Sequence, residues 1–569
     1  MTRPLAPWRV LLLLGVAGVM FFLRLDSKSL TDNEETRFAL QAREMIRTGD
    51  WVVPRWSHRP LGTKPPLFTW SVAWISLAAG RVNEWTARLP SAAAALGTVL
   101  LVYALGVRWF GRPAALWGAL ALSSSFLFWD SARFARSDML LTCFATASLV
   151  FLIFGTEAKR GSALWLLAAF AASGLAVLSK GPVGFALPAL AGFLYLTLRR
   201  RWGAFPGWSY AAAAILFLAL ASPWYAFYNR VAGEKYFWEM LVRQNVTRYV
   251  SAFDHPNPVY FYAGYFPPNF LPWMGGMLPA LAYGATRDWR HRDAAVLAFV
   301  WWAAIFLFFS LSESKRPSYI LPAFPPAALL TGHFLQAEVF GRKPAERNRW
   351  GRLGAFLLAA TFAGMVAGGF GVPVWAALEE PPLLVPALIV GALWMAAGLW
   401  ALWAHRRQGA ARGTAVFLGG ILASQVAAQW TLVPAIDRER SPAPGARAVV
   451  EAAGDGHIVA YRFDKASLAF YGRRGRDGGG AAGEIYYLRS PRLLDYFLKD
   501  LQAPAYVLIQ SKDYRELPEA FQSRTRVVLA DLPYGKYRAM LLANRFPPSA
   551  PVEDGRPVSD SKSRGRPPR

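Results

Sequence analysis

Charged residues are scarce in this chain. They make up 17% of its 569 residues, whereas soluble globular proteins average about 25%. The deficit lies in long apolar runs, such as residues 211–221 and 383–403, and several runs reach the roughly 20 residues that a helix needs to cross a bilayer. These repeated runs disfavour the alternative of a large soluble protein with buried helices. The sequence therefore predicts an α-helical polytopic membrane protein.

Cysteine and signal-peptide features are also lacking. Cys143 is the only cysteine and lies in an apolar run, so no internal disulfide can form and no thiol chemistry is implied. No small-residue cleavage site follows the first apolar run, which Arg24 ends directly, so this run is predicted to be an uncleaved first span. Aromatic residues are abundant instead, with 24 Trp, 21 Tyr and 38 Phe, as the belts at membrane interfaces require.

Net charge and hydropathy together predict a topology. The net charge of +26 would elsewhere suggest a nucleic-acid partner, but in a membrane protein basic residues mostly retain the cytoplasmic loops. With the N-terminus inside, the inner connections hold twenty Lys and Arg residues, against five in the short outer connections. This asymmetry places the long connections 26–84 and 229–267, and everything after about residue 434, outside the cytoplasm. About thirteen spans are predicted near 8–25, 85–107, 113–131, 137–156, 162–178, 182–198, 209–228, 268–286, 294–312, 318–337, 353–374, 383–404 and 414–433.

Five basic residues lie on the outer side, against this orientation signal. Each belongs to a short polar insertion between spans. Snorkelling to nearby headgroups would explain any single one, but an external cationic pocket for a phosphorylated, membrane-embedded substrate explains the set better. The five are Arg133, Arg136, Lys180, Lys315 and Arg316.

The first external loop, 26–84, is long and polar. Apolar residues recur at helical spacing over 34–47, which predicts an amphipathic helix that begins with Glu34 and Glu35 and ends at Gly49. A second helix is predicted to begin at Lys64-Pro65-Pro66. Acids at a helix start usually just compensate the dipole. The alternative is catalytic, because a carboxylate can orient or deprotonate an acceptor while cations stabilise a departing phosphate.

A series of motifs, in order along residues 8–340, resembles the aminoarabinose transferases. These enzymes modify lipid A and belong to the protein-mannosyltransferase-like superfamily, with the GT-C fold. The motifs are EETRFA (34–39), AREM (42–45), GDWVVP (49–54), KPP (64–66), RSD (136–138), LSKGP (178–182), SPWY (222–225), QNVTRY (244–249), PW (272–273), SKR (314–316) and YILP (319–322).

The resemblance implies a set of site residues. The acceptor-activating acid falls within the pair Glu34 and Glu35, and Asp138 matches a second family carboxylate. Lys64 and Arg248 match cations that hold the phosphate of the lipid carrier. Further candidates for contacts with phosphate or sugar are Tyr319, Lys180, Arg136, Arg37, His255 and Lys315.

The chain departs from the family pattern at two positions. Glu34 stands where the family usually has Asp, so either the site accommodates an extra methylene group or Asp32 takes part. Thr63 stands where some relatives have a Glu of a zinc site. Six His are scattered through the chain without metal-ligand spacing, so catalysis is predicted to need neither metal nor cofactor.

The implied reaction moves 4-amino-4-deoxy-L-arabinose from undecaprenyl phosphate to a lipid A phosphate, at the periplasmic face of the bacterial inner membrane. The expected partners are polyprenyl phosphate, lipid A or a similar acceptor, and the membrane, with no nucleic acid and a monomeric enzyme. One alternative is transfer of another polyprenyl-linked sugar (mannose, galacturonate or an aminohexose) to lipid, glycan or protein. A second is transport of lipid-linked sugars. Transporters place polar groups near the membrane midplane, whereas the ionisable residues here cluster at outer span ends.

Composition changes near residue 434. The preceding residues, 1–434, are predicted to form the transmembrane catalytic domain. Helices are predicted over 447–453 and 493–501 and strands over 458–461, 505–509, 526–529 and 537–542, which makes 435–546 a small periplasmic α/β domain. The glycine-rich segment 475–480 lacks the GxxxxGK[ST] pattern and is predicted to be a flexible loop. The basic tail, 547–569, is predicted to be disordered.

Overall fold

The computed structural model of the chain separates into two compact units, residues 1–441 and residues 442–569. The residues that the structure describes are 7–31, 33–56, 59–60, 64–158, 160–286, 294–454, 456–463, 466–472, 485–500, 505–535 and 537–544.

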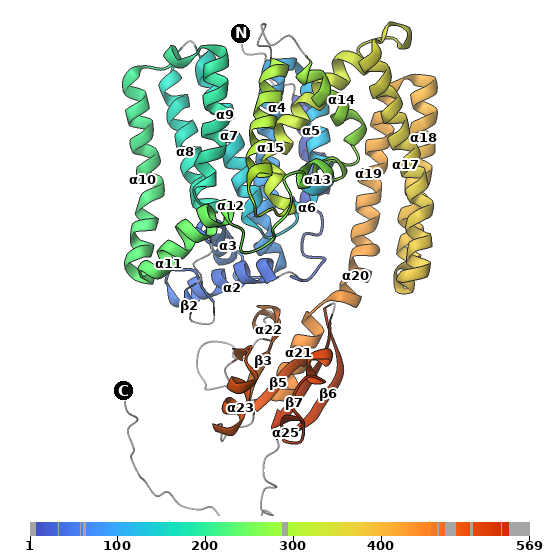
Figure 1. The fold of residues 1–569 in the computed structure, drawn as a ribbon. Coiled ribbons are helices and arrows are strands. Elements are labelled where there is room, and N and C mark those ends of the chain that lie inside the picture. The colour runs from blue at the N-terminus through green and yellow to red at the C-terminus, as the bar shows by residue number, and fades with distance from the viewer. Residues whose placement is uncertain are drawn as a thin grey trace, which may run out of the picture. The chain divides into compact units, whose positions relative to one another are not determined.

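The first unit is helical (Figure 1). Its elements before residue 270 are α1 (Pro7–Ala17), the π-helix η1 (Gly18–Phe22), α2 (Asn33–Thr48), β1 (Arg55–Trp56), β2 (Arg59–Pro60), α3 (Leu67–Ala78), α4 (Glu84–Phe110), α5 (Arg112–Ser124), α6 (Phe126–Ala132), α7 (Ser137–Glu157), α8 (Ser162–Lys180), α9 (Val183–Arg199), the 3-10 helix η2 (Trp202–Ala204), α10 (Gly207–Ala232), α11 (Glu234–Trp238), the π-helix η3 (Glu239–Thr247), α12 (Arg248–Val250) and α13 (Phe261–Asn269). Those after it are α14 (Met274–Ala285), α15 (Ala294–Leu311), the 3-10 helix η4 (Pro317–Ala323), α16 (Phe324–Phe334), the π-helix η5 (Leu335–Phe340), the 3-10 helix η6 (Pro344–Glu346), α17 (Arg349–Glu379), the 3-10 helix η7 (Pro381–Leu383), α18 (Leu384–Gln408), α19 (Ala410–Trp430) and α20 (Leu432–Arg440).

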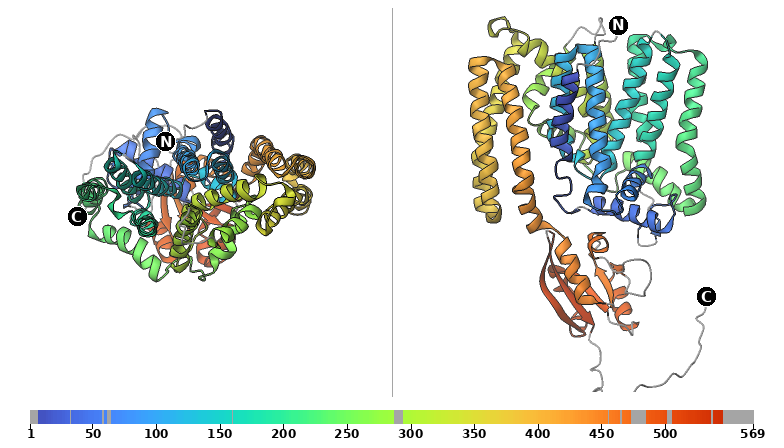
Figure 2. Two further views of the ribbon diagram at one scale, coloured as in Figure 1. Left: turned by 90° about the horizontal axis from the view of Figure 1, so that it is seen from above. Right: turned by 180° about the vertical axis from the view of Figure 1, so that it is seen from behind.

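The long helices run side by side, in two flanking groups and a centre. In both side views, α7–α10 stand on one flank and α17–α19 on the other, with α4, α5 and α14–α16 between them (Figures 1 and 2). Among the described residues, eight helices are long and apolar enough to cross a membrane, and shorter apolar helices cover Pro7–Phe22, Leu67–Ala78 and Val183–Arg199. Every predicted span overlaps helical structure. The polytopic helical fold is confirmed, and the count of thirteen spans stays a prediction.

Small residues let the central helices pack closely. A Cβ atom added to Gly332 of α16 would lie 2.3 Å from backbone atoms of Ala114 and Gly118 on α5. No side chain larger than hydrogen would therefore fit there. Such close approach of two helix backbones is typical of helix contacts in membranes, where it replaces the hydrophobic driving force. A large apolar core surrounds the contact and includes Trp273 and Phe324, both fully buried.

One predicted span is interrupted in the structure, and one long connection contains helices. The span predicted over 113–131 breaks between α5 and α6, because the Phe126 N–H donates to the carbonyl of Leu271 (2.8 Å) instead of continuing the helix. The long connection 229–267 is largely helical, since α11, η3 and α12 follow one another over 234–250.

The second unit is a small α/β unit. Its elements are α21 (Ala443–Ala453), β3 (His457–Tyr461), α22 (Ala466–Tyr471), β4 (Ile485–Leu488), α23 (Pro491–Asp500), β5 (Ala505–Gln510), α24 (Ser511–Tyr514), α25 (Glu519–Gln522), β6 (Thr525–Tyr534) and β7 (Tyr537–Asn544). The strand order is β4-β3-β5-β7-β6, with β3 parallel to β4 and β5, and β7 antiparallel to β5 and β6.

Alternate side chains of β3 and β5 belong to two different apolar clusters. Ile458 and Leu508 belong to one cluster and Val459 and Val507 to the other, as the two-residue period of a strand requires. The strands predicted over 526–529 and 537–542 lie within β6 and β7, which pair antiparallel. The predicted boundary at 434 lies inside α20, and the predicted loop 475–480 and tail 547–569 lie outside the described residues.

Candidate active site

The long connection 26–84, which the sequence predicts to be external, contains two helices that lie against each other. In the side views α2 runs across the ends of the long helices (Figures 1 and 2). It spans Asn33–Thr48 and ends at Gly49, which has a φ of +72° that favours glycine, so both features of the prediction are confirmed. The second helix, α3, begins at Leu67, directly after Lys64-Pro65-Pro66. Phe38 of α2 and Phe68 of α3 meet edge to face, with ring centroids 4.7 Å apart. This contact fixes α2, which carries the two carboxylates, relative to the segment that carries Lys64.

A cavity of about 280 Å³ lies beside this loop. Three cations line it, Lys64, Lys180 and Arg248, and we call them the cavity cations. The hydroxyl-bearing side chain of Tyr319 lines it too. The remaining lining includes an apolar wall from α7, α9 and α15, formed by Leu141, Val183, Ala186, Phe308 and Phe309. The cavity therefore combines a positively charged region with walls suited to a hydrocarbon chain.

Two of the cavity cations are held by acids and by Tyr319. Lys180, in the last turn of α8, forms an ion pair with Asp138, in the first turn of α7, and its ammonium lies 4.2 Å from the ring centroid of Tyr319. Nη2 of Arg248 lies 2.7 Å from Oδ2 of Asp254, and its Nη1 donates to the Tyr319 hydroxyl at 3.4 Å. Tyr319 thus contacts both cations, which come from segments far apart in the sequence.

Lys64, the third cavity cation, has a different environment. Among the described residues its ammonium has no hydrogen bond or ion pair, although it lines the cavity. Burial, and next the nearby charge of Lys180, lower the pKa of Lys64 below its ordinary value. An anion in the cavity would offset both effects, because it would supply the missing partner and favour the charged lysine.

Glu34 links the loop to the outer cations. Its Oε2 lies 3.4 Å from Nε of Arg136 and 3.6 Å from Nη1 of Arg316. Nη2 of Arg316 also lies 3.6 Å from Oδ2 of Asp254, the acid that holds Arg248. Charges of alternating sign therefore run from Glu34 to the cavity cations.

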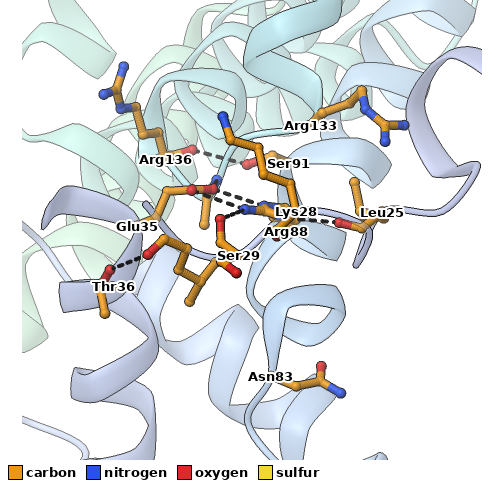
Figure 3. Close-up of polar contacts among 12 residues, drawn as sticks. Leu25, Lys28, Ser29, Glu35, Thr36, Asn83, Arg88, Ser91, Arg133 and Arg136 are labelled. Carbon is orange, nitrogen blue, oxygen red and sulfur yellow. Dashed lines mark hydrogen bonds and ion pairs between the residues drawn. The ribbon is translucent and has the colours of Figure 1, made fainter. Parts of the chain in front are cut away.

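Glu35 has a different environment from its neighbour. It is fully buried, and its two carboxylate oxygens accept from Nε and Nη2 of Arg88 at 3.0 and 3.1 Å. Oε1 also accepts from the Ala135 N–H at 2.9 Å. Figure 3 shows the Arg88 guanidinium between Glu35 and the backbone of residues 25–29. The predicted catalytic pair is thus divided: Glu34 faces the outer cations, and Glu35 is a buried structural partner of Arg88.

Three predicted binding residues lie elsewhere. Lys315 is buried, and its ammonium donates to the carbonyls of Asn257 (2.8 Å) and Ser312, while burial lowers its pKa. The side chain of His255 is exposed, and its carbonyl accepts from the Lys315 N–H at 3.1 Å. Arg37 lies on α2, and the described residues lining the cavity include none of these three. Lys315 and His255 therefore shape a loop, since their polar groups are engaged there, and do not face the cavity.

Sequence reasoning did not select Arg316, Asp254 or Arg88 as site residues. Arg316 was one of the five outer cations, so its signal was present in the charge pattern. Asp254 sits one residue before His255 without a recognisable spacing to Arg248. Arg88 reads as an ordinary basic residue near a helix start. For the last two, only the folded chain reveals the partners.

The described residues hold no grouping of three or more His, Cys, Asp or Glu side chains suited to a metal. Thr63, the position that differs from zinc-binding relatives, lies outside the described residues, as does Asp32. Metal-independent catalysis stays a prediction.

Known proteins resemble the chain in sequence and in fold. The family whose model matches residues 63–227 is described as dolichyl-phosphate-mannose-protein mannosyltransferase. An uncharacterized protein of Aquifex aeolicus is 33% identical over 331 residues, which are 58% of this chain and 64% of that protein. The undecaprenyl phosphate-alpha-4-amino-4-deoxy-L-arabinose arabinosyl transferase of Pseudomonas aeruginosa (strain UCBPP-PA14) is 31% identical over 401 residues, 69% of this chain and 71% of that enzyme.

A solved structure extends the likeness to nearly the whole chain. The crystal structure of ArnT from Cupriavidus metallidurans bound to undecaprenyl phosphate has a TM-score of 0.77 and 26% identity, and covers 95% of this chain and 98% of that one. Sequence, fold and a cavity lined by both cations and apolar side chains agree with one another. The chain therefore belongs to the aminoarabinose transferase family of multi-pass membrane glycosyltransferases with the GT-C fold.

Proposed function

We propose that this chain transfers 4-amino-4-deoxy-L-arabinose from undecaprenyl phosphate to a phosphate of lipid A. It acts as a monomer, without metal or cofactor, at the periplasmic face of the bacterial inner membrane. The bias of basic residues toward the opposite side of the membrane supports this orientation. It places the first loop and the α/β unit in the periplasm.

One observation carries the proposal, the composition of the cavity. A polyprenyl phosphate needs cations for its head and an apolar surface for its chain. Lys64, Lys180 and Arg248 offer the first, and the side chains of α7, α9 and α15 offer the second. A sugar nucleotide would not need the apolar walls, so the cavity favours a lipid-linked donor.

For this sugar transfer, the protein needs mainly to position the two substrates and to stabilise the charge on the departing phosphate. The cavity cations bind the donor phosphate and stabilise the negative charge that it gains as the bond to the anomeric carbon breaks. Asp138 holds Lys180 in place through their ion pair. Glu34 orients the acceptor, or takes its proton when the acceptor is protonated. A lipid A phosphate is already ionised near neutral pH, so positioning and electrostatics then provide most of the rate.

Mass spectrometry of lipid A tests this function in cells that depend on the protein for the modification. We expect the aminoarabinose increment with the wild-type chain and its loss with Glu34→Gln and with Asp138→Asn. Glu44→Gln is the matched control, because Glu44 lies on the same helix with a similar exposed fraction, 23% against 22% for Glu34, and pairs with Arg47. An increment that survives both site substitutions would contradict the catalytic assignment. No increment with the wild-type chain would point to another sugar or acceptor.

A further inference from the structure

Two arginines reach Glu34 from separate elements. Arg136 directly precedes α7, and Arg316 directly precedes η4. Both approach the same carboxylate oxygen, at 3.4 and 3.6 Å. The described residues that line the cavity include neither of them. The cations near the site therefore form two groups, the cavity cations and this arginine pair.

The arginine pair retains the capacity to bind an anion. A guanidinium group has five N–H donors, and distances of 3.4 and 3.6 Å to Glu34 exceed those of ordinary N–H···O hydrogen bonds. The two side chains are 30% and 33% exposed, so a ligand can reach them. Arg136, Arg316 and Arg248 carry three positive charges against the two negative charges of Glu34 and Asp254. One positive charge in this series of ion pairs, which includes the cavity cation Arg248, is therefore not offset by Glu34 and Asp254.

We propose that Arg136 and Arg316 bind the acceptor phosphate beside Glu34, while the cavity cations bind the donor phosphate. This inference rests on the proposed function and adds the residues that recognise the acceptor. An attacking phosphate must approach a second phosphate of the same sign, so each needs its own cations. The planar fork of a guanidinium matches two phosphate oxygens at once. In the reaction, an acceptor phosphate oxygen forms a bond to the anomeric carbon, and the bond from that carbon to the donor phosphate oxygen breaks, with its electron pair leaving on undecaprenyl phosphate.

Asp254 contacts one cation of each group and so fixes their relative position. Its Oδ2 lies 2.7 Å from Nη2 of Arg248 and 3.6 Å from Nη2 of Arg316, and its Oδ1 accepts from the Ser314 hydroxyl at 3.1 Å. One carboxylate thus positions a donor-side cation and an acceptor-side cation. Asp254 is a positioning residue, since it acts through the two arginines.

Steady-state kinetics of the full-length protein in lipid nanodiscs separate the two groups. We expect Arg316→Gln to raise the KM for lipid A by about tenfold or more, the usual effect of losing a charge-assisted contact, and to leave the KM for the donor within about twofold. Arg316→Lys keeps the charge but loses the fork, so its effect is intermediate. Arg47→Gln is the control, because Arg47 lies at the other end of α2, is 56% exposed and pairs with Glu44; it changes neither KM. An equal rise of both KM values in Arg316→Gln, or no rise in either, overturns the proposal.

A binding measurement keeps the test independent of catalysis and of any one variant. Wild-type protein is expected to bind lipid A more tightly than lipid A stripped of its phosphates, and Arg136→Gln and Arg316→Gln are each expected to lose this preference. A preference that survives in both folded variants refutes the acceptor site. Absence of sugar transfer by the wild-type protein, together with a preference that the variants lose, refutes the proposed function and retains the phosphate site.

Discussion

Replacing Arg88 is expected to destabilise the protein far more than breaking an exposed ion pair. Arg88 is 3% exposed, binds both oxygens of Glu35, and donates to the carbonyls of Leu25 (3.0 Å), Lys28 (2.6 Å) and Ser29 (3.0 Å). Methionine would fill similar space but leave these carbonyls without their donor and Glu35 charged in a buried site. Removal of one partner from a buried pair costs about 3–5 kcal/mol, whereas an exposed pair contributes about 0–1 kcal/mol. We therefore expect Arg88→Met to lower the free energy of unfolding by about 3–5 kcal/mol.

A double-mutant cycle with Glu35 measures the pair itself. Reversible unfolding in mixed micelles, followed by tryptophan fluorescence, gives the free energy for Arg88→Met, Glu35→Gln and the double variant. We expect the double variant to lose about 0.5–3 kcal/mol less than the sum of the single losses, because neither variant alone removes both buried charges. The exposed pair Arg47–Glu44 serves as the control and couples by less than about 1 kcal/mol. Additive losses would refute the structural role, and loss of sugar transfer in Glu35→Gln at unchanged stability would return Glu35 to the catalytic residues.

Further expectations follow from the cavity and its acids. Because burial and Lys180 lower the pKa of Lys64, affinity for undecaprenyl phosphate should fall as the pH rises through that lowered value, where the lysine loses its charge; calorimetric titrations against pH should show the fall in the wild type and not in Lys64→Arg. Asp254→Asn should raise the KM values for donor and acceptor together, by about 3–10-fold each, since Asp254 contacts both Arg248 and Arg316; a change confined to one substrate would argue against its linking position. Prolonged dialysis against EDTA should leave the transfer rate of the purified protein unchanged, and restoration of a lost rate by added zinc would show that the predicted metal independence is wrong.

Much of the fold can be predicted from the sequence, because the patterns that indicate its helices, strands and turns are local or periodic. Hydrophobic runs of span length predict the polytopic helical fold, which the structure and its relatives confirm. Apolar spacing over 34–47 and Gly49 predict α2 and its end, since amphipathic periodicity and a positive φ are properties of the segment itself. The antiparallel pairing of β6 with β7 follows in the same way from two strands separated by a short turn.

Only the tertiary structure determines which charged side chains pair with one another. Glu34 and Glu35 are adjacent in the sequence and equally acidic, yet Glu34 pairs with Arg136 and Arg316 while Glu35 is buried against Arg88. Consecutive residues of a helix point about 100° apart, so the packing of α2 determines which carboxylate meets which arginine. The charge pattern of the sequence predicts a region that binds phosphate. Only the fold, which brings distant loops within ion-pair distance, divides the cations of this region between the cavity and Glu34.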